Sequence, residues 1–422
     1  MITIAGRRDR TRPPTAAAGP VGAGAFQAVV LVTGMGLGLT APFTAVLVLA
    51  LGGSTTDAAL TVSSMGLSLL IVDLFGSRVL PRLGSRWVLC GSSLIFGVGA
   101  VMTALSTVWV VALIARVLQG FGAALFMAGG IHLAVRLGQQ HRRSSAAAIG
   151  GFNAAWFAGI AIGPLTGGVV AGWAGSADPA DGYRLLFAVC AGVNLLAAGL
   201  ALLLPRVPGT GRPRLSLPRG LGLRGARVWA VMGLAATGQI VRSAIAMTMV
   251  PLAGEAVGMD STALGGTLFA LAITDITVMA WSSRWSERHG RRPLLIGSLL
   301  WGAALTTTLA LVDPPPLVVA ACALGLGVTV GATWTLPTAM AVDLMADAES
   351  AVSAYRIASD IGMVAGGAMA ALALATVGLS GSLLAATGVL LLGLLLALVV
   401  GETRMPSTTS AKGTPAHAPA ID

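Results

Sequence analysis

Charged side chains inside apolar runs are the residues of this chain best suited to chemistry. Asp275 lies within one such run, about seven residues from its end, and Arg116 and Arg242 lie within two others. Ionisable groups inside a membrane segment are costly, so they face a cavity or a partner and mark ion or substrate pathways. A carboxyl group in such surroundings is suited to taking up and releasing a proton. Asp275 is therefore the first candidate for a proton carrier, and the alternative is a fixed partner of Arg242 or of a loop arginine.

Two further acids lie in apolar runs and are weaker candidates for proton coupling. Asp73 is near the end of its run, where a structural ion pair with Arg78 or Arg82 is the favoured interpretation. Asp360 follows Arg356 by four residues, a spacing that places both side chains on one helix face. Such a pair is more typical of a gate or of a neutralised structural pair than of a proton site.

The two arginines inside apolar runs need acceptors. Arg116 precedes Gln119 by about one helical turn, and we expect it to act in coupling, with structural hydrogen bonding as the alternative. The partner of Arg242 is either Asp275 or Asp360, and the sequence does not choose between them. An arginine near the middle of a membrane segment also suits an anionic substrate.

Aromatic, thioether and amide side chains suit an adaptable apolar pocket. The candidates for such a substrate pocket are Phe126, Met127, Asn153, Trp156, Phe157, Gln239 and Met247. Ordinary helix packing or lipid contact is an equally good interpretation for each of them taken alone.

The composition predicts an all-α membrane protein. Of 422 residues, 55% are hydrophobic and 10% charged, with a mean hydropathy of +0.86. Repeated apolar runs of about 20 residues are typical of membrane-spanning helices, and the short alternating segments of a closed barrel are missing. The net charge of +10 lies in short loops between the runs, which favours membrane orientation over nucleic-acid binding. The three cysteines lie far apart within apolar runs, so they indicate neither a disulfide framework nor a metal site.

The order of the runs predicts twelve helices in two halves. We expect a disordered cytoplasmic tail over residues 1–25, a first six-helix half over 26–204, a basic linker over 205–227, a second half over 228–400 and a disordered cytoplasmic tail over 401–422. Arginines gather in alternate loops, whereas the opposite loops carry mostly acids. This asymmetry predicts that both termini are cytoplasmic and that the protein spans the cell membrane several times.

The two halves repeat. Ser77 to Arg86 aligns with Ser283 to Arg292, 206 positions later, and Gly159-x-x-x-Gly163 aligns with Gly362-x-x-x-Gly366, 203 positions later. Similar offsets for separate motifs predict two parallel six-helix repeats with a binding cavity at the midplane. In the first half, the stripe Gly159, Gly163, Gly167 and Gly168 surrounds Pro164, which indicates helices that pass closely and bend.

Three motifs resemble those of the major facilitator superfamily, and within it the twelve-helix drug:proton antiporters. Arg116-x-x-Gln119-Gly120-x-Gly122 is similar to the helix-4 motif of the family, and the Gly159 to Gly168 stretch is similar to its helix-5 antiporter motif. The loop signature of the family is matched at Ser283 to Arg292 and is degraded at Ser77 to Arg86, where Pro81 replaces its acid. The residues that the resemblance assigns to a cytoplasmic loop gate are Arg82, Gly84, Arg86, Glu287, Arg288, Gly290, Arg291 and Arg292.

The resemblance implies a bundle of twelve helices that works as a secondary transporter without a cofactor, driven by a proton gradient. With Pro81 in place of the acid, latching of the gate is expected to rest on Glu287 with Arg288 or Arg291. The first helix contains no acid, unlike that of many multidrug exporters of this family, so the charge of the substrate stays open.

The chain shows no phosphate-binding loop, no metal-spaced His/Cys cluster and no other enzyme signature. We expect a monomer that meets the lipid bilayer, protons and a small-molecule substrate, and no nucleic acid. The leading hypothesis is proton-coupled export of small amphipathic compounds, either drugs or secreted metabolites. The alternatives are an importer or facilitator of a polar or anionic solute and, from another class, a membrane scaffold or sensor that does not transport.

Overall fold

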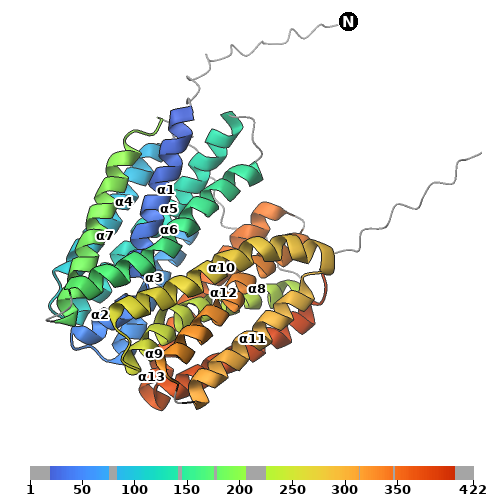
Figure 1. Cartoon of the computed structure of the whole chain (residues 1–422). Coiled ribbons are helices and arrows are strands. Elements are labelled where there is room, and N and C mark those ends of the chain that lie inside the picture. Colours follow the sequence, from blue (N-terminus) through green and yellow to red (C-terminus); the bar gives the residue numbers. More distant parts are fainter. Residues whose placement is uncertain are drawn as a thin grey trace, which may run out of the picture. The chain divides into compact units, whose positions relative to one another are not determined.

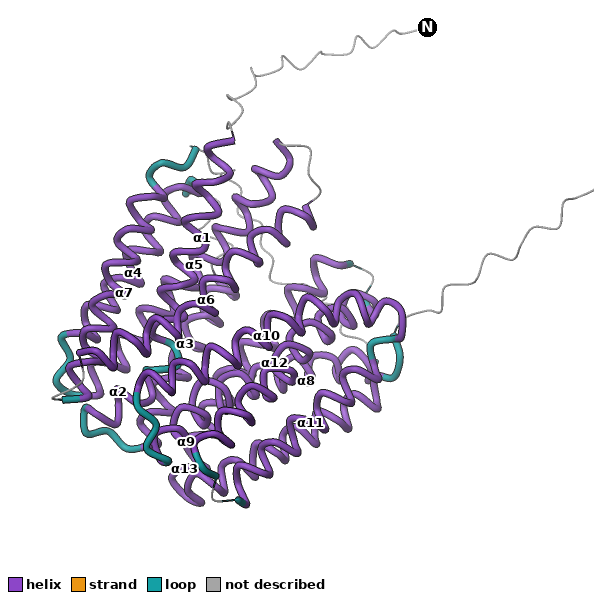
Figure 2. The backbone as a smooth tube through the Cα atoms, viewed as in Figure 1, coloured by secondary structure: helices purple, strands orange, loops and turns teal. Residues whose placement is uncertain are grey.

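The computed structural model of the chain describes residues 20–75, 83–140, 145–174, 178–205, 225–312, 314–345 and 347–403. These residues form helices and short connections, with no strand among them (Figure 1, Figure 2). Arg78 and Arg82, which the sequence suggests as partners of Asp73, lie outside the described residues, as do most of the expected tails and the linker.

The chain divides into two compact units. Unit 1 comprises residues 1–217 and 259–269, and unit 2 comprises residues 218–258 and 270–422. The short stretch 259–269 therefore packs with unit 1, although it lies beyond the expected linker in the sequence.

Unit 1 holds seven helical segments among its described residues: α1 (Pro20–Thr40), α2 (Thr44–Ala50), α3 (Thr55–Phe75), α4 (Ser85–Ala104), α5 (Trp109–Gln140), α6 (Ser145–Ala174) and α7 (Pro179–Ala201). The first predicted helix is interrupted between Thr40 and Thr44, because Pro42 has no N–H to continue the hydrogen-bond ladder. Asp178 caps α7, accepting a hydrogen bond from the Ala180 N–H at 2.8 Å. In this unit α1 packs on α6 and α7, and α4 packs on α5 and α7.

Unit 2 holds the remaining helices: α8 (Ala226–Ile240), the π-helix η3 (Val241–Met249), α9 (Val250–Ala256), most of α10 (Ser261–His289), α11 (Arg292–Leu311), α12 (Pro316–Leu344) and α13 (Ala348–Val400). The three segments α8, η3 and α9 follow one another without a break and form a single span from Ala226 to Ala256. Within the unit, α8 packs on α12 and α13, and α11 packs on the same two helices.

The described chain is rich in long apolar helices. It contains 11 spans that are long and apolar enough for a membrane, and the last of them, Ser350–Val400, has 51 residues. A straight helix of that length would measure about 75 Å, against an apolar bilayer core of about 30 Å. Gly378, at φ 67° and ψ −169°, breaks this span into two helices. The predicted all-α fold is confirmed.

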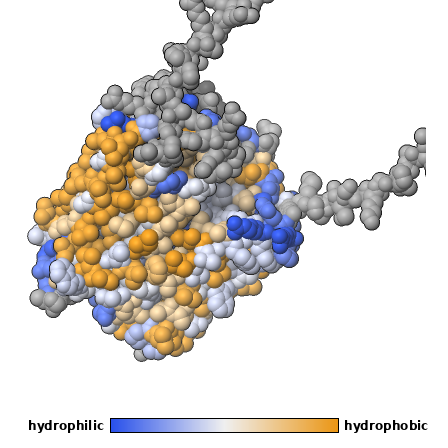
Figure 3. Space-filling model, turned by 45° about the horizontal axis from the view of Figure 1, so that its top comes forward, coloured by the Kyte–Doolittle hydropathy of each residue, from blue (hydrophilic) through white to orange (hydrophobic). Residues whose placement is uncertain are grey.

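Large apolar side chains remain exposed along the helices of both units. Figure 3 shows apolar residues covering broad areas of the surface. The most exposed large apolar side chains of the described chain are Leu105, Trp173, Leu203, Leu311 and Leu317. Soluble proteins rarely expose so many large apolar groups, whereas a helix in a bilayer meets lipid there. The protein is therefore a multi-pass membrane protein.

Glycines let helices α1 and α6 of unit 1 approach backbone to backbone. A Cβ atom on Gly159 would lie 2.7 Å from the Met35 nitrogen, and one on Gly163 would overlap the backbone of Gly38. The same contact recurs in unit 2, where a Cβ on Gly366 would lie 2.8 Å from the Cα of Ile240. The glycine stripe is thus the seam of a helix pair, repeated at the offset that the sequence shows.

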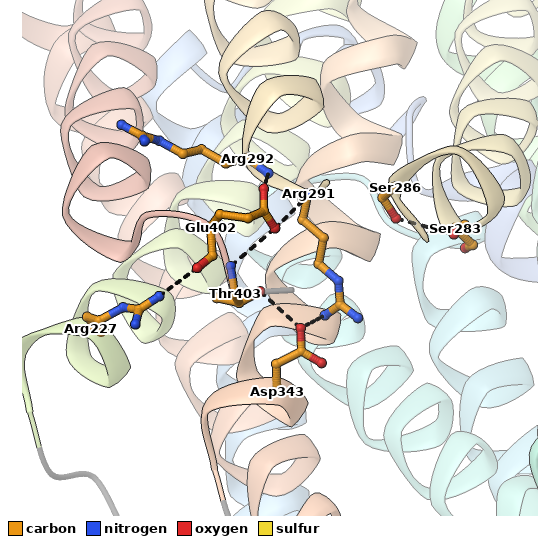
Figure 4. A network of polar contacts seen from close by, with 8 residues as sticks. All are labelled: Arg227, Ser283, Ser286, Arg291, Arg292, Asp343, Glu402 and Thr403. Atoms are coloured by element: carbon orange, nitrogen blue, oxygen red, sulfur yellow. Dashed lines mark hydrogen bonds and ion pairs between the residues drawn. The ribbon is translucent and has the colours of Figure 1, made fainter. Parts of the chain in front are cut away.

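The last described residues, Gly401, Glu402 and Thr403, form what we call the C-terminal clasp (Figure 4). The carboxylate of Glu402 accepts hydrogen bonds from the backbone N–H groups of Arg291 and Arg292, each at 3.1 Å. These donors lie at the N-terminus of α11, where a negative charge is stabilised by the exposed N–H groups and the helix dipole. Gly290, just before them, has φ +89° and leaves no room for a Cβ beside the same carboxylate.

Two more contacts connect the clasp to the other helices of unit 2. Arg227, at the start of α8, donates to the backbone oxygens of Val400 at 2.6 Å and Glu402 at 2.9 Å. Asp343, near the end of α12, forms an ion pair with Arg291 at 2.6 Å and accepts from the Thr403 hydroxyl at 3.0 Å. The clasp therefore joins one end of four helices: α8, α11, α12 and α13.

The α1–α6 seam predicts a steric effect. Gly163→Ala should lower the yield of folded protein and destabilise it by about 1–3 kcal/mol, because the new methyl group overlaps Gly38. The matched control is Gly192→Ala in α7, where a Cβ would meet no atom within 4 Å. Thermal unfolding in detergent compares the two, and an equal response of both variants would contradict the role of the seam.

The clasp predicts an electrostatic effect. Glu402→Gln should destabilise the protein by about 1 kcal/mol, because it removes the charge and turns one acceptor oxygen into a donor that faces a backbone N–H. Glu255→Gln removes the same charge from an exposed side chain outside the clasp and serves as the control. The change in Tm on each substitution is the measurement, and a shift no larger for Glu402 than for Glu255 would show that the clasp adds no stability.

Candidate functional site

An ion pair inside unit 2 is the most unusual polar contact of the described chain. The Nη2 of Arg242 lies 3.0 Å from Oδ2 of Asp275 and 3.3 Å from its Oδ1. The side chains are only 14% and 5% exposed, so the pair is largely shielded from its surroundings. Of the two acids that the sequence offers to Arg242, the structure pairs it with Asp275.

The π-helix η3 presents Arg242 to this partner. Arg242 is its second residue, and the Thr248 hydroxyl donates to the Ser243 carbonyl, five residues earlier, at 2.8 Å. Pro251, the second residue of α9 after η3, cannot donate to the preceding turn, an interruption of the α-helical ladder that a wider π-turn accommodates. Short π-segments are frequent at functional sites, because they change the direction in which one side chain points.

Two glycines of α12 position Asp275 on α10. A Cβ on Gly327 would lie 3.0 Å from the Asp275 nitrogen, and one on Gly331 would overlap the Asp275 carbonyl oxygen. The backbone of α10 therefore lies directly against α12 at the acid. This contact fixes the backbone position of Asp275.

Two aromatic residues that sequence reasoning missed surround the pair. The guanidinium carbon of Arg242 lies 5.2 Å from the ring centroid of Trp334, within cation–π distance. The Tyr355 ring meets Trp334 edge-on at 6.3 Å, and its hydroxyl donates to the Trp334 carbonyl at 2.9 Å. A signal existed in the sequence: Trp334 lies well inside an apolar run, and Tyr355 is one of only 2 tyrosines in the chain.

The other candidates of unit 2 lie on the same helices or near them. Gln239, 8% exposed, precedes Arg242 by three residues, and Met247 is half-buried further along η3. Asp360, 9% exposed, and Arg356 lie on the first part of α13. Their roles in binding or coupling stay predictions.

Arg116 of unit 1 is buried without an acid. It is 1% exposed, its Nη1 donates to the Gln119 oxygen at 2.9 Å, and Gln119 in turn contacts the Thr103 hydroxyl at 3.3 Å. Its Nε and Nη2 have no hydrogen-bond acceptor among the described residues. The hydrogen bond to Gln119 agrees with a structural role for Arg116, which is one of the two roles that the sequence suggests. The Nε and Nη2 donors are available to a further partner.

Four aromatic rings stack inside unit 1. Phe26 lies 6.2 Å from Phe152, Phe152 lies 6.3 Å from Trp156, and Trp156 lies 5.6 Å from Phe126. All four are buried, so the pocket candidates Trp156 and Phe126 are part of a packed core in this structure. The neighbouring candidates Met127, Asn153 and Phe157 are half-buried.

The residues expected to form the cytoplasmic loop gate have separate environments. Gly84 precedes α4 in an extended conformation, and the Arg86 guanidinium lies 5.7 Å from the Trp87 ring. Glu287 and Arg288 are exposed, and neither forms an ion pair within the described chain. Arg291, one of the expected partners of Glu287, pairs with Asp343 in the clasp instead.

The antiporter-like motif of α6 has a second face. Gly167 packs against Phe43 and Leu39, whereas a Cβ on Gly168 would lie 2.8 Å from the Cα of Gly265 in the first turns of α10. Pro164 adds its carbonyl to this contact, since a Cβ on Gly265 would lie 2.6 Å from it. Nearby, the hydroxyls of Tyr183 and Ser261 are 3.1 Å apart. These contacts explain why residues 259–269 belong to unit 1.

Comparison with known proteins finds a relative that matches part of the sequence. The chain is 28% identical over 137 residues to the quinolone resistance protein NorA of Staphylococcus aureus (strain N315), and the same values hold for NorA of strain MW2. The match covers 32% of this chain and 35% of NorA, so the chain spans about a third of the length of these relatives.

Solved transporters share the fold over nearly the whole chain. The nucleoside transporter NupG (D323A mutant) superposes with a TM-score of 0.73 at 13% identity, covering 89% of this chain and 98% of NupG. A bacterial homologue of the human lysosomal transporter Spinster, inward-facing and unoccupied, gives a TM-score of 0.75 at 15% identity over 91% of this chain and 97% of its own. At such identities the likeness concerns the fold.

The family is shown by a match to nearly the whole sequence. The family described as Major Facilitator Superfamily matches residues 28–274 and 231–422. Together with the all-helical fold, this match places the protein among transporters rather than enzymes. The chain belongs to the Major Facilitator Superfamily.

Proposed function

We propose that the protein exports small amphipathic compounds in exchange for protons, by alternating access. One observation carries the proposal: the ion pair between Arg242 and Asp275 in the interior of unit 2. A buried carboxylate is costly and marks a proton or ion pathway in membrane proteins. The partial likeness to NorA, named a quinolone resistance protein, supports a drug-like substrate.

Asp275 is the group that we assign to proton exchange. As a carboxylate it accepts a hydrogen bond from Arg242 at Oδ1, its Oδ2 lies 3.0 Å from the same nitrogen, and the attraction between the opposite charges holds the pair. When Asp275 takes up a proton, it becomes a neutral acid and this attraction is lost. Arg242 keeps its charge beside the face of Trp334, which stabilises a cation.

Exchange follows if substrate and proton act on the same pair. Protonation of Asp275 removes the carboxylate charge from the pair, and deprotonation restores it. A substrate that needs the charged pair and a proton that abolishes it are then bound alternately, which is the requirement for antiport. We propose no cofactor, since the proton gradient supplies the energy.

Orientation, location and assembly belong to the same proposal. The arginine-rich loops support cytoplasmic termini in a cell membrane, and Arg284, Arg288, Arg291 and Arg292 at the α10–α11 connection are part of that pattern. We propose a monomer, because each six-helix half is expected to find its partner within one chain.

A second candidate function is transport of an anionic solute. It is favoured by Arg116, whose Nε and Nη2 have no acceptor among the described residues, since a buried guanidinium readily binds a carboxylate or phosphate. Asp275 neutralises Arg242, so only Arg116 supports this candidate.

Everted membrane vesicles with a fluorescent reporter of the pH gradient test the function. Cationic, neutral and anionic amphipathic compounds are added after energisation, with vesicles lacking the protein as the control. Compounds that collapse the gradient only in the presence of the protein are expected. A response limited to anionic solutes would favour the second candidate, and no response over a broad panel would reject proton exchange.

Asp275→Asn should reduce this collapse to the level of vesicles without the protein, because the amide cannot take up and release a proton at these pH values. Folding should be retained, since the Asn oxygen still accepts a hydrogen bond from Arg242. Glu255→Gln, which changes an exposed acid outside the pair, is the control. Full proton exchange by the Asn variant, at normal expression, would exclude Asp275 as the carrier.

The pair also predicts a stability pattern. Arg242→Gln alone should destabilise the protein by about 3 kcal/mol, because it leaves a buried carboxylate without its cation. Combining it with Asp275→Asn should recover much of this loss, since the double variant buries two neutral amides. Thermal unfolding of the two single variants and the double variant forms the cycle, and strictly additive effects would show that the two groups do not interact.

A further inference from the structure

The end of α10 carries aromatic and basic residues on one face. Trp281, Arg284, Trp285, Arg288 and His289 follow one another within two helical turns, at spacings that place them on a single side of the helix. The opposite side is the packed one, where Ser282 and Ser286 are 0% and 3% exposed. We call the five outward residues the aromatic–basic stripe.

The three rings of the stripe form a ladder. Trp281 stacks on Trp285 with centroids 5.5 Å apart, and Trp285 stacks on His289 at 4.6 Å. The ladder is accessible, because Trp281 is 48% exposed and His289 is exposed at the end of the helix. Stacking restricts the rings, so the surface that they offer is ordered before any partner arrives.

The two arginines beside the ladder carry uncompensated charge. Arg284 and Arg288 are exposed, one helical turn apart, and neither forms an ion pair with a residue that the structure describes. Glu287 lies between them in sequence and is exposed as well, but it forms no ion pair with either arginine within the described chain. Arg291, three residues further on, differs because Asp343 neutralises it.

The stripe continues an apolar face of the same helix. Ile273, 44% exposed, and Thr277 precede Trp281 at intervals of four residues, so the exposed face changes from uncharged side chains to alternating aromatic and basic ones toward the helix end. A phospholipid likewise changes from uncharged acyl chains to a glycerol region and a charged phosphate. Tryptophan is typical of that middle region, and the planar guanidinium group binds phosphate with two parallel hydrogen bonds.

We propose that the aromatic–basic stripe binds the headgroup of an anionic phospholipid. Arg284 and Arg288 contact the phosphate, and the ladder of Trp281, Trp285 and His289 packs along the glycerol region. Two uncompensated positive charges favour a headgroup with a net negative charge over a zwitterionic one. The site does not depend on proton exchange, so it stands or fails separately from the proposed function.

Native mass spectrometry of the detergent-purified protein tests the site. Phosphatidylglycerol and phosphatidylcholine are titrated in parallel, and the fraction of protein that carries bound lipid is measured. The intact protein should retain phosphatidylglycerol preferentially. Arg284→Gln combined with Arg288→Gln should weaken this binding by about tenfold or more, since each arginine near a membrane surface contributes to the attraction of anionic lipid.

Matched variants separate this site from general charge effects. Arg136→Gln removes an exposed arginine near the end of α5 and should leave phosphatidylglycerol binding unchanged, whereas Arg284→Gln alone should reduce it. Trp281→Leu should weaken the binding of both lipids while the preference for the anionic one persists. Comparable Tm values of all variants establish that they are folded.

Three results would overturn the assignment. One is equal binding of the two lipids by the intact protein, and another is an equal loss in Arg136→Gln and Arg284→Gln. The third concerns the source of the phosphate: if glycerol phosphate displaces phosphatidylglycerol at equal concentration, the site takes a soluble phosphate and the lipid assignment is wrong.

Discussion

A carboxylate buried in an apolar helix bundle requires a cation within hydrogen-bond distance, and the architecture of unit 2 around Asp275 meets this requirement. The glycines Gly327 and Gly331 bring α12 against the backbone that carries the acid, and the π-helix η3 turns Arg242 toward it. Trp334 then stabilises the guanidinium from its ring face. The π-helix η3 and the two glycines of α12 thus contribute to one contact, in which Nη2 of Arg242 lies 3.0 Å from Oδ2 of Asp275. An uncompensated charge there would cost several kcal/mol.

The two halves of the chain share a packing plan and differ in their polar interior. The glycine seam between α1 and α6 recurs between α8 and α13, which indicates that close helix approach is general scaffold. The buried charge is handled differently in each half: Arg116 finds a neutral amide, Gln119, whereas Arg242 finds an acid. Of these two arrangements, the pair of Arg242 and Asp275 contains a carboxylate that can take up a proton, whereas Gln119 cannot. This difference favours unit 2 over unit 1 as the place of proton exchange.

Much of the fold could be predicted from the sequence, because long apolar runs, glycine spacing and loop arginines are local signals of what each segment buries. The sequence could not show that Asp275 is the partner of Arg242, because this pairing depends on how α10 and η3 pack against each other. Trp334 and Tyr355 were missed for the same reason: one lies inside an apolar run and the other beside Arg356, and neither position shows that it lies near Arg242 in space. The expected pairing of Glu287 with Arg291 rested on short sequence distance, whereas Arg291 meets Asp343 through tertiary packing.

The C-terminal clasp has a consequence for the making of the protein. A chain is synthesised from its N-terminus, so the residues of α8, α11 and α12 are made before Glu402, and the first N–H groups of α11 have no access to this acceptor until Glu402 has been added. The contacts that join these helix ends therefore form only after the helices themselves have been synthesised. A stop codon just before Glu402 would keep the described apolar spans, which end at Val400, but would remove the contacts of Glu402 and Thr403 that join the helix ends.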